Sequence, residues 1–323
     1  MITKLLITKI LITNPVIVII VITGPTAIGK TNLSLLLAKS ITNTLIVSVD
    51  SRQIYKLMDI GTDKVSKQIR KEIPHYLIDI INPNKDFSLW EFLNISKKIT
   101  EFAIKKRKNL IFVGGTILYI RALIEGFNLL PTNPIIRKKY ENLETQKLQE
   151  NLLEIDKKFG TNFHTSIKDK RRMVRILEVY EITQKNPLEL WKTKTPLPID
   201  KIIILENHRE KIYQNINNRV DKQIKQGLVD EVKFILKKFP EAAHFKSMKT
   251  FGYYETIQYI TGKIDLQQTI SLIKKNTRRF AKRQLTFLKK IIPLPMNIEI
   301  IKVYEFNENF NDIANHICQK LNY

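Results

Sequence analysis

The chain has 323 residues, 43% of them hydrophobic and 26% charged, which is enough for a large folded core and excludes a disordered or collagen-like protein. Its formal net charge is +23, from 54 Lys and Arg against 31 Asp and Glu, and so basic a balance favours a polyanionic partner, nucleic acid first. The many Lys, Ile and Asn residues are also what a gene of low GC content would encode. Local clusters of basic residues are therefore better evidence for a nucleic-acid partner than the net charge is. A single cysteine, Cys318, excludes a disulfide framework and a cysteine-built zinc site, and fits a reducing cytosol.

The first 23 residues are apolar but do not predict a membrane span. Two lysines, Asn14 and Pro15 interrupt the segment, so it never reaches the roughly 18 consecutive apolar residues of a spanning helix. It also continues into a glycine-rich motif where a signal peptide would have a cleavage site. We therefore expect a short overhang before a buried strand, no membrane partner, and a cytoplasmic protein that acts as a monomer.

Runs of aliphatic and β-branched residues alternate with helical patterns along the first half of the chain. Such runs are typical of parallel strands that are buried on both faces, and the alternation predicts an α/β fold with a parallel sheet flanked by helices. The expected strands are 16–23, 44–49, 110–113 and 201–205, and the expected helices before the middle of the chain are 32–40 and 89–106.

The middle of the chain has a different composition. Glycine almost vanishes between residues 129 and 200, and prolines bracket helical segments at 135–156 and 169–183. We predict a core built from residues 1–128 and 200–323, interrupted by a mostly helical insertion domain at 129–199. In the second part of the core the pattern predicts helices at 210–226, 229–239 and 265–290, followed by a polar tail.

A phosphate-binding motif follows the first predicted strand. The stretch matches G-x-x-x-x-G-K-[ST] in full and leads into a predicted helix, which is the context that a P-loop requires. Successive backbone N–H groups and the helix N-terminus would face a polyphosphate, Lys30 would add a positive charge, and Thr31 would hold Mg²⁺. The fold is therefore predicted to be P-loop NTPase-like. The motif consists of Gly24, Pro25, Thr26, Ala27, Ile28, Gly29, Lys30 and Thr31.

The neighbouring strand ends do not look like those of an NTP hydrolase. A hydrolase usually has an Asp at the end of a neighbouring strand to hold its metal, whereas strand 110–113 ends in Gly114, Gly115 and Thr116. Strand 44–49 does end in Asp50, but Ser51-Arg52-Gln53 follows, which is more typical of a substrate-facing loop. The pattern favours a pyrophosphate leaving group in the cradle.

Taken together, the motifs resemble those of the tRNA dimethylallyltransferase (tRNA isopentenyltransferase) family in its bacterial form. The likeness extends from about residue 16 to residue 289. Arg52, Ile117 and Phe287 stand where the family usually has other residues. The blocks that carry it are 24–31, 50–55 with 58–62, 74–75 with 77–79, 113–123, 172–175 with 177–179, 219–221 with 227–228, 252–253 and 277–284.

The resemblance implies a prenyltransferase that moves a dimethylallyl group from dimethylallyl diphosphate to N6 of the adenosine immediately 3′ of the tRNA anticodon, releasing diphosphate. It implies that residues 24–31 bind the diphosphate with Mg²⁺ and that Asp50 is the general base. It also implies that Thr116 and Arg219 serve the reaction centre and that the insertion grips the anticodon stem-loop. A carboxylate suits this chemistry, because removing a proton relieves the poor nucleophilicity of an exocyclic adenine amine.

Two clusters of basic residues support contact with a nucleic-acid backbone. One begins the predicted helix near residue 170, and the other lines the predicted helix 265–290, whose opposite stripe carries Ile273, Phe280 and Phe287, expected to be core. Tyr119 and His75 are expected to be packing residues. The expected tRNA contacts are Asp50, Ser51, Arg52 and Gln53; Arg171, Arg172, Met173, Val174 and Arg175; and Lys282, Arg283 and Gln284.

Two other functions remain open from the sequence. One is an adenine-nucleotide prenyltransferase or small-molecule kinase on the same P-loop scaffold, which would need neither the insertion nor the basic helices. The other is a non-catalytic RNA-binding protein with a relict P-loop, which the intact Lys30, Thr31 and Asp50 disfavour.

Overall fold

The computed structural model describes residues 17–128, 130–192, 194–291, 297–321 and 323. The chain divides into two compact units, and each is described by itself. One is formed by the chain up to Arg121 and from Leu197 onward, and the other by Ala122–Pro196, where the sequence predicted an insertion at 129–199. The predicted N-terminal overhang lies outside the described residues. No helix among those residues is long and apolar enough to span a membrane.

The first unit is built on a six-stranded parallel sheet, which confirms the predicted fold class. Its strand order is β3-β2-β4-β1-β5-β6, so β1 lies in the centre and the chain crosses over after every strand. The strands are β1 (Ile19–Thr23), β2 (Thr44–Val49), β3 (His75–Tyr76), β4 (Asn109–Gly114), β5 (Lys201–Glu206) and β6 (Ile298–Lys302).

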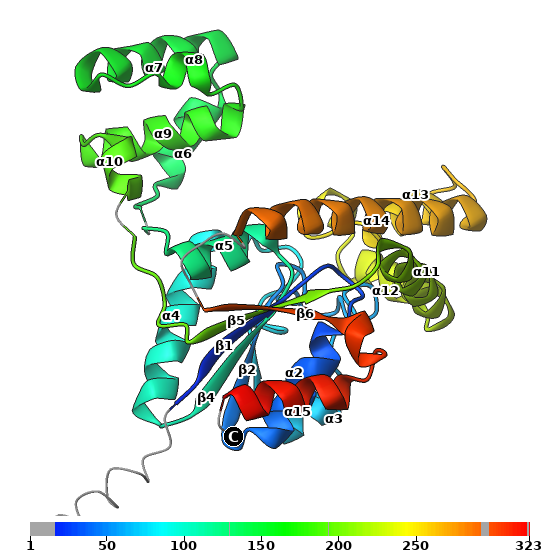
Figure 1. Cartoon of the computed structure of the whole chain (residues 1–323). Helices are drawn as coiled ribbons and strands as arrows, with labels where there is room; N and C mark the ends of the chain where they lie inside the picture. The colour runs from blue at the N-terminus through cyan, green and yellow to red at the C-terminus, as the bar shows by residue number, and fades with distance from the viewer. Residues whose placement is uncertain (1–16, 129, 193, 292–296, 322) are drawn as a thin grey trace, which may run out of the picture. The chain divides into compact units, whose positions relative to one another are not determined.

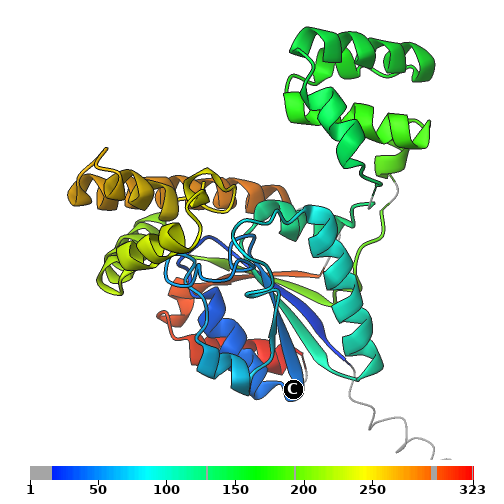
Figure 2. The same cartoon turned by 180° about the vertical axis from the view of Figure 1, so that it is seen from behind.

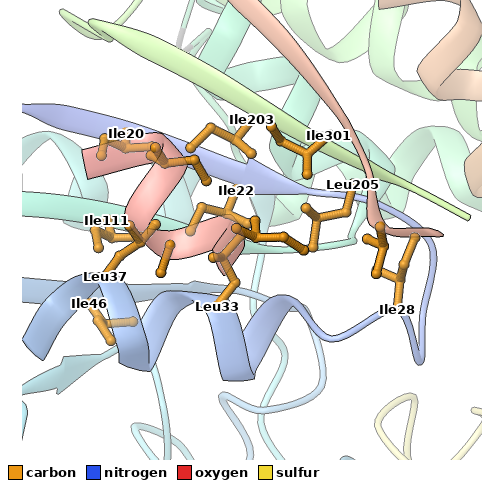
Figure 3. Packing of buried hydrophobic residues seen from close by; sticks show 14 of the residues in the cluster. Ile20, Ile22, Ile28, Leu33, Leu37, Ile46, Ile111, Ile203, Leu205 and Ile301 are labelled. Carbon is orange, nitrogen blue, oxygen red and sulfur yellow. The ribbon is translucent and has the colours of Figure 1, made fainter. Parts of the chain in front are cut away.

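The central strands are buried on both faces, as their continuous aliphatic runs predict. All residues of β1 and β2 are buried, and alternate side chains point to opposite faces of the sheet. Ile20, Ile22 and Ile203 point to one face, where they meet Leu33 and Leu37 (Figure 3). This packing fixes the carboxyl ends of β1, β2 and β4 at one edge of the sheet.

Helices cover both faces of this sheet. The first face carries α2 (Lys30–Ser40) and α15 (Phe310–Lys320), which pack side by side, while α4 (Leu89–Lys105) lies across the sheet from them (Figures 1 and 2). Beyond the sheet edge, α11 and α13 both pack against the long α14. The other α-helices described in this unit are α3 (Lys67–Glu72), α5 (Ile117–Glu125, which runs into the second unit), α11 (Arg209–Lys225), α12 (Leu228–Lys238), α13 (Tyr253–Ile260) and α14 (Leu266–Ile291).

The predicted polar tail was wrong, because the last part of the chain completes the sheet and its cover. β6 extends the sheet beyond β5, and α15 buries Ile313, Ala314 and Ile317 against the core. In α15 the apolar residues recur with helical spacing but alternate with polar ones, and in so short a segment this pattern is weak.

The second unit is a small helical bundle with its own core. It contains α6 (Pro134–Glu141), α7 (Thr145–Phe159), α8 (Phe163–Ser166), α9 (Lys170–Thr183) and α10 (Pro187–Lys192). The single helix predicted at 135–156 is broken at residues 142–144, because the turn there lets both α6 and α7 pack against α9. Their contacts bury Tyr140, Leu148 and Leu177 among other apolar side chains.

Candidate active site

The turn between β1 and α2 forms the predicted phosphate cradle. Gly29 sits at the start of α2 with a φ of 99°, a left-handed conformation that glycine adopts at little cost. A Cβ at this position would lie 2.1 Å from Cζ of Phe310, so α15 also requires glycine here. The Lys30 ammonium donates hydrogen bonds to the carbonyls of Gly24 (3.1 Å) and Pro25 (2.8 Å), which closes the turn on itself. The backbone is thus shaped for an anion before any anion binds.

Two cations face the cavity in front of this turn. Lys30 comes from α2 and Arg219 from α11, and both line a cavity of about 380 Å³. Burial, followed by the positive charge of Arg219, lowers the pKa of Lys30 to about 7. Burial also lowers the pKa of Arg219, against the opposing effects of Asp63 and Asp50.

The positive charge of this cavity is only partly balanced. Arg219 forms a long ion pair with Asp63, with 3.9 Å between Nη1 and Oδ2, and the buried Nε of Arg219 has no acceptor among the described residues. An anion in the cavity would supply that acceptor and raise the pKa of Lys30 again. The site therefore fits a diphosphate.

Asp50 lies at the carboxyl end of β2, next to the end of β4. Its Oδ1 accepts a hydrogen bond from Arg52 N (2.7 Å), which fixes the turn after the strand. Thr116 lies beside it: its Oγ1 accepts from Ser51 N (2.9 Å) and its own N donates to Val49 O (3.2 Å). The parallel register of β2 and β4 brings these two strand ends together, as open α/β sheets commonly do for ligand sites.

A second cavity of about 460 Å³ adjoins the first. Both cavities are lined by Asp50 and Arg219, so the general-base candidate and this cation both lie where the cavities adjoin. The residues that line both are Thr26, Asp50, Thr62, Arg219 and Phe280. Such an arrangement can hold two substrates that approach the reacting atoms from different sides.

Comparison with known proteins agrees with this geometry. A family model described as IPP transferase matches residues 53–291. The chain belongs to the IPP transferase family. Among curated relatives, the tRNA dimethylallyltransferase of Thermosipho africanus is 42% identical over 275 residues, covering 84% of this chain and 89% of the relative. That of Halothermothrix orenii is 43% identical over 283 residues and covers 84% of both chains.

Solved structures show the same IPP transferase architecture. The tRNA delta(2)-isopentenylpyrophosphate transferase of Staphylococcus epidermidis is 32% identical, with a TM-score of 0.68 over 95% of this chain and 99% of that one. A eukaryotic dimethylallyltransferase acting on tRNA is 25% identical, with a TM-score of 0.80 over 94% of this chain and 78% of that one.

Within this family member, the residues predicted at the reaction centre lie together in the first unit. Asp50 and Arg219 line both cavities, and Thr116 lines the second with Ser51 and Arg52. Gln53 lines the first cavity instead, where its side chain bonds Ser48 Oγ (2.8 Å) and Thr62 O (3.2 Å). Their roles in catalysis stay predictions.

Gln284 occupies a different place from the one predicted. Its side chain is only 3% exposed, its Oε1 accepts from Thr26 N (2.8 Å) and its Nε2 donates to Gly115 O (2.7 Å). It therefore clamps the phosphate turn to the loop after β4, and it also lines the first cavity. Lys282 and Arg283, its neighbours on α14, are exposed. Arg283 lines the second cavity and its guanidinium lies 5.7 Å from the centre of the Phe280 ring.

Three aromatic residues expected to be packing residues, Tyr119, Phe280 and His75, have different outcomes. Tyr119 is buried and stacks on Phe92 with 4.0 Å between ring centres. Phe280 is half-buried and lines both cavities, so its ring belongs to the site. His75 is also half-buried and lines the first cavity. The heptad stripe on α14 could not distinguish a core position from a cavity wall.

In the helical unit, only part of the predicted arginine cluster is available to a partner. Arg171 and Arg172 are exposed in the first turn of α9, but Met173 and Val174 belong to the hydrophobic core. Arg175 bonds Glu178 (2.8 Å) and the carbonyls of Pro131 (2.9 Å) and Leu130 (3.0 Å). Met173 and Val174 therefore pack inside the bundle and Arg175 is hydrogen-bonded to it, so these three side chains stabilise the helical unit.

Sequence reasoning missed several residues of the cavity walls. Asp63, Lys249 and Phe251 line one cavity or the other and were assigned no role. Asp63 directly follows the block 58–62, which was a usable signal. Lys249 and Phe251 reach the second cavity from a turn before α13. Phe251 directly precedes the block 252–253, which was a usable signal, whereas no motif marks Lys249.

Proposed function

We propose that this protein transfers a dimethylallyl group from dimethylallyl diphosphate to N6 of the adenosine immediately 3′ of the anticodon in tRNA, releasing diphosphate. The observation that carries the proposal is the pair of adjoining cavities that share Asp50 and Arg219, one of them lined by the phosphate cradle. The relatives' names support the same reaction.

The diphosphate of the donor would lie in the first cavity. There Lys30, Arg219 and the start of α2 line the cavity and would face its phosphates. Negative charge grows on the diphosphate as its bond to the prenyl carbon breaks, and fixed positive groups that need no rearrangement stabilise that charge. The unbalanced charge of the cavity supports this role.

The adenine would enter from the second cavity and present its amine to Asp50. The N6–carbon bond forms while the carbon–oxygen bond to diphosphate breaks, and the electron pair of the broken bond leaves with diphosphate. The proton of N6 passes to the Asp50 carboxylate. Thr116 would keep that carboxylate in place through its hydrogen bond with Ser51 N. An adenine stacked in a loop must first leave its stack to reach such a site.

We propose Mg²⁺ as the cofactor, held in part by Thr31. The first cavity offers oxygen ligands suited to this ion, the Thr31 hydroxyl and the carboxylate of Asp63. The described residues contain no group of three or more acidic, histidine or cysteine side chains able to hold a metal alone. This supports a site completed by substrate phosphates, where Mg²⁺ would neutralise part of the diphosphate charge.

The helical unit would grip the stem of the anticodon arm through Arg171 and Arg172. The loop would be contacted by Ser51, Arg52, Lys282 and Arg283, since RNA stems are held by backbone and shape while loops are recognised through splayed bases. Arg52 and Arg283 line the second cavity, which supports that assignment. The proposal also places the enzyme in the cytosol, in keeping with its free, buried Cys318.

The test is incubation of the pure protein with dimethylallyl diphosphate, Mg²⁺ and unmodified tRNA, followed by nucleoside mass spectrometry. Prenylated adenosine at the position after the anticodon supports the proposal, and the Asp50→Asn variant is the matched control. ATP hydrolysis without tRNA would favour a kinase, and prenylation of free AMP but not tRNA would favour an adenine-nucleotide prenyltransferase. Either result contradicts the proposal.

A further inference from the structure

A short turn after Met58 forms part of the wall of both cavities. Thr62 lines both, and Asp63 lines the first, where its carboxylate lies 3.9 Å from Nη1 of Arg219. This turn therefore carries the carboxylate that forms an ion pair with the Arg219 guanidinium.

The turn is held from outside by one carboxylate, that of Glu231 in the first turn of α12. Glu231 Oε2 accepts from the backbone N–H groups of Asp59 (2.9 Å) and Ile60 (2.8 Å), and Oε1 from that of Gly61 (3.3 Å). Three successive N–H groups around an anion form a concave backbone site of the kind that binds phosphates elsewhere. Here the anion is supplied by the protein.

Tyr253 completes this arrangement. Its hydroxyl donates to Glu231 Oε1 (2.6 Å), and its side chain is fully buried. Burial, reinforced by Glu231, raises the pKa of Tyr253 well above its ordinary value, so the hydroxyl keeps its proton and remains a donor. A Cβ on Gly61 would lie 2.5 Å from the Tyr253 ring, so the turn can approach only because this residue is glycine.

Two further contacts make the turn rigid. Gln223 Nε2 donates to Ile60 O (3.0 Å), and the almost fully buried Lys64 ammonium bonds both Asp59 (2.8 Å) and Asp79 (2.6 Å). Lys64 fixes the end of the turn next to Asp63, and Glu231 fixes the other end. Hydrogen bonds to a charged group are about twice as strong as neutral ones, so Glu231 is the dominant attachment on its side.

We propose that Glu231 is a positioning residue for the phosphate cavity. By holding the N–H groups of residues 59–61 it keeps Asp63 beside Arg219, and so directs the guanidinium at the diphosphate. The inference rests on the proposed function, because the bound anion is taken to be the diphosphate of the prenyl donor. The affinity for diphosphate can nevertheless be measured without tRNA or turnover.

The experiment is a double-mutant cycle, with the affinity for inorganic diphosphate measured by calorimetry on the full chain. We expect Glu231→Ala to weaken binding about tenfold in the wild-type background and to have no further effect in an Arg219→Met background, because its effect acts through Arg219. Glu231→Gln should lose much less, since its amide oxygen can still accept from Asp59 and Ile60. Asp230→Ala is the matched control, because it removes an exposed carboxylate from the same helical turn.

An unchanged affinity in Glu231→Ala, or an equal loss in both backgrounds, would overturn the inference. If Glu231→Ala does not fold, Glu231→Asp carries the same prediction, because it keeps the charge but withdraws the carboxylate by one methylene. A wild-type protein that binds diphosphate but prenylates no tRNA would refute the proposed function while the cycle still decides the role of Glu231.

Discussion

The guanidinium of Arg219 acts on the ammonium of Lys30 across the first cavity: after burial, its positive charge is the main cause that lowers the Lys30 pKa to about 7. A lysine at this pKa is partly neutral near physiological pH. Its charge therefore depends on whether an anion is bound.

We expect diphosphate binding at pH 8 to be accompanied by proton uptake at Lys30. With a pKa of about 7, roughly nine in ten Lys30 side chains are neutral at that pH, and a bound anion restores the charged form. Calorimetry in two buffers of different ionisation enthalpy measures the protons exchanged. The Lys30→Met variant should take up nearly one proton fewer than the wild type, and equal uptake by the two proteins would contradict the prediction.

Asp50→Asn should lower the rate of the chemical step by about 10²-fold or more while tRNA binding is nearly unchanged. The amide oxygen can still accept from Arg52 N, so the turn after β2 is kept, but the amide cannot take the proton of N6. Single-turnover kinetics with saturating tRNA measure the effect. A rate within a few-fold of wild type would leave Asp50 with a structural role only.

Replacing Arg171 and Arg172 together by Ala should raise the apparent KM for tRNA and flatten its salt dependence, with little effect on dimethylallyl diphosphate. Each phosphate contact contributes somewhat under one unit to the slope of log affinity against log salt. Lys105→Ala with Lys106→Ala is the control of equal charge, placed at the end of α4 that precedes β4, at the edge of the sheet away from the cavities. Identical salt slopes in the two double variants would show that the arginines do not contact tRNA.

Arg175→Ala should destabilise the helical unit by about 3 kcal/mol, because it leaves the fully buried Glu178 with only Arg137 as an ionic partner. Burial alone would raise the pKa of Glu178, but hydrogen bonds from Arg137 and Arg175 outweigh it and lower that pKa. The stabilisation is therefore present above the ordinary value of 4.5 and is lost as the pH falls through the lower folded value. Chemical denaturation at pH 7 and pH 3.5 measures both effects.

Arg171→Ala is the control for that experiment, since Arg171 is exposed on the same helix. If the two variants unfold alike, the contacts of Arg175 with Glu178 and the carbonyls of residues 130 and 131 do not stabilise the bundle.

The sheet and its phosphate cradle could be predicted because their signals are local. Continuous aliphatic runs marked β1, β2, β4 and β5 to within a few residues, and the P-loop spacing located the turn between β1 and α2 that lines the first cavity. β6 escaped prediction because it has only five residues, and α15 because polar residues interrupt its apolar ones, so neither short pattern was decisive.

The hydrogen-bond partners of individual side chains could not be predicted from the spacing of residues in the sequence. Gln284 and Arg175 both lie in basic stretches that predicted contact with RNA, yet each has its polar atoms occupied by groups distant in the sequence. A pattern of charged residues in the sequence indicates which side chains can face solvent. The hydrogen bonds of Gln284 and Arg175 depend instead on which loops the fold places next to these side chains.

The contact between Phe310 and Gly29 has a consequence for synthesis of the chain. The P-loop is translated long before α15, the helix that carries the ring packed behind it. Until then the turn lacks one of its walls, and β5, which pairs with β1, is also still to come. A nascent chain therefore cannot assemble a complete cradle before both β5 and α15 have been made.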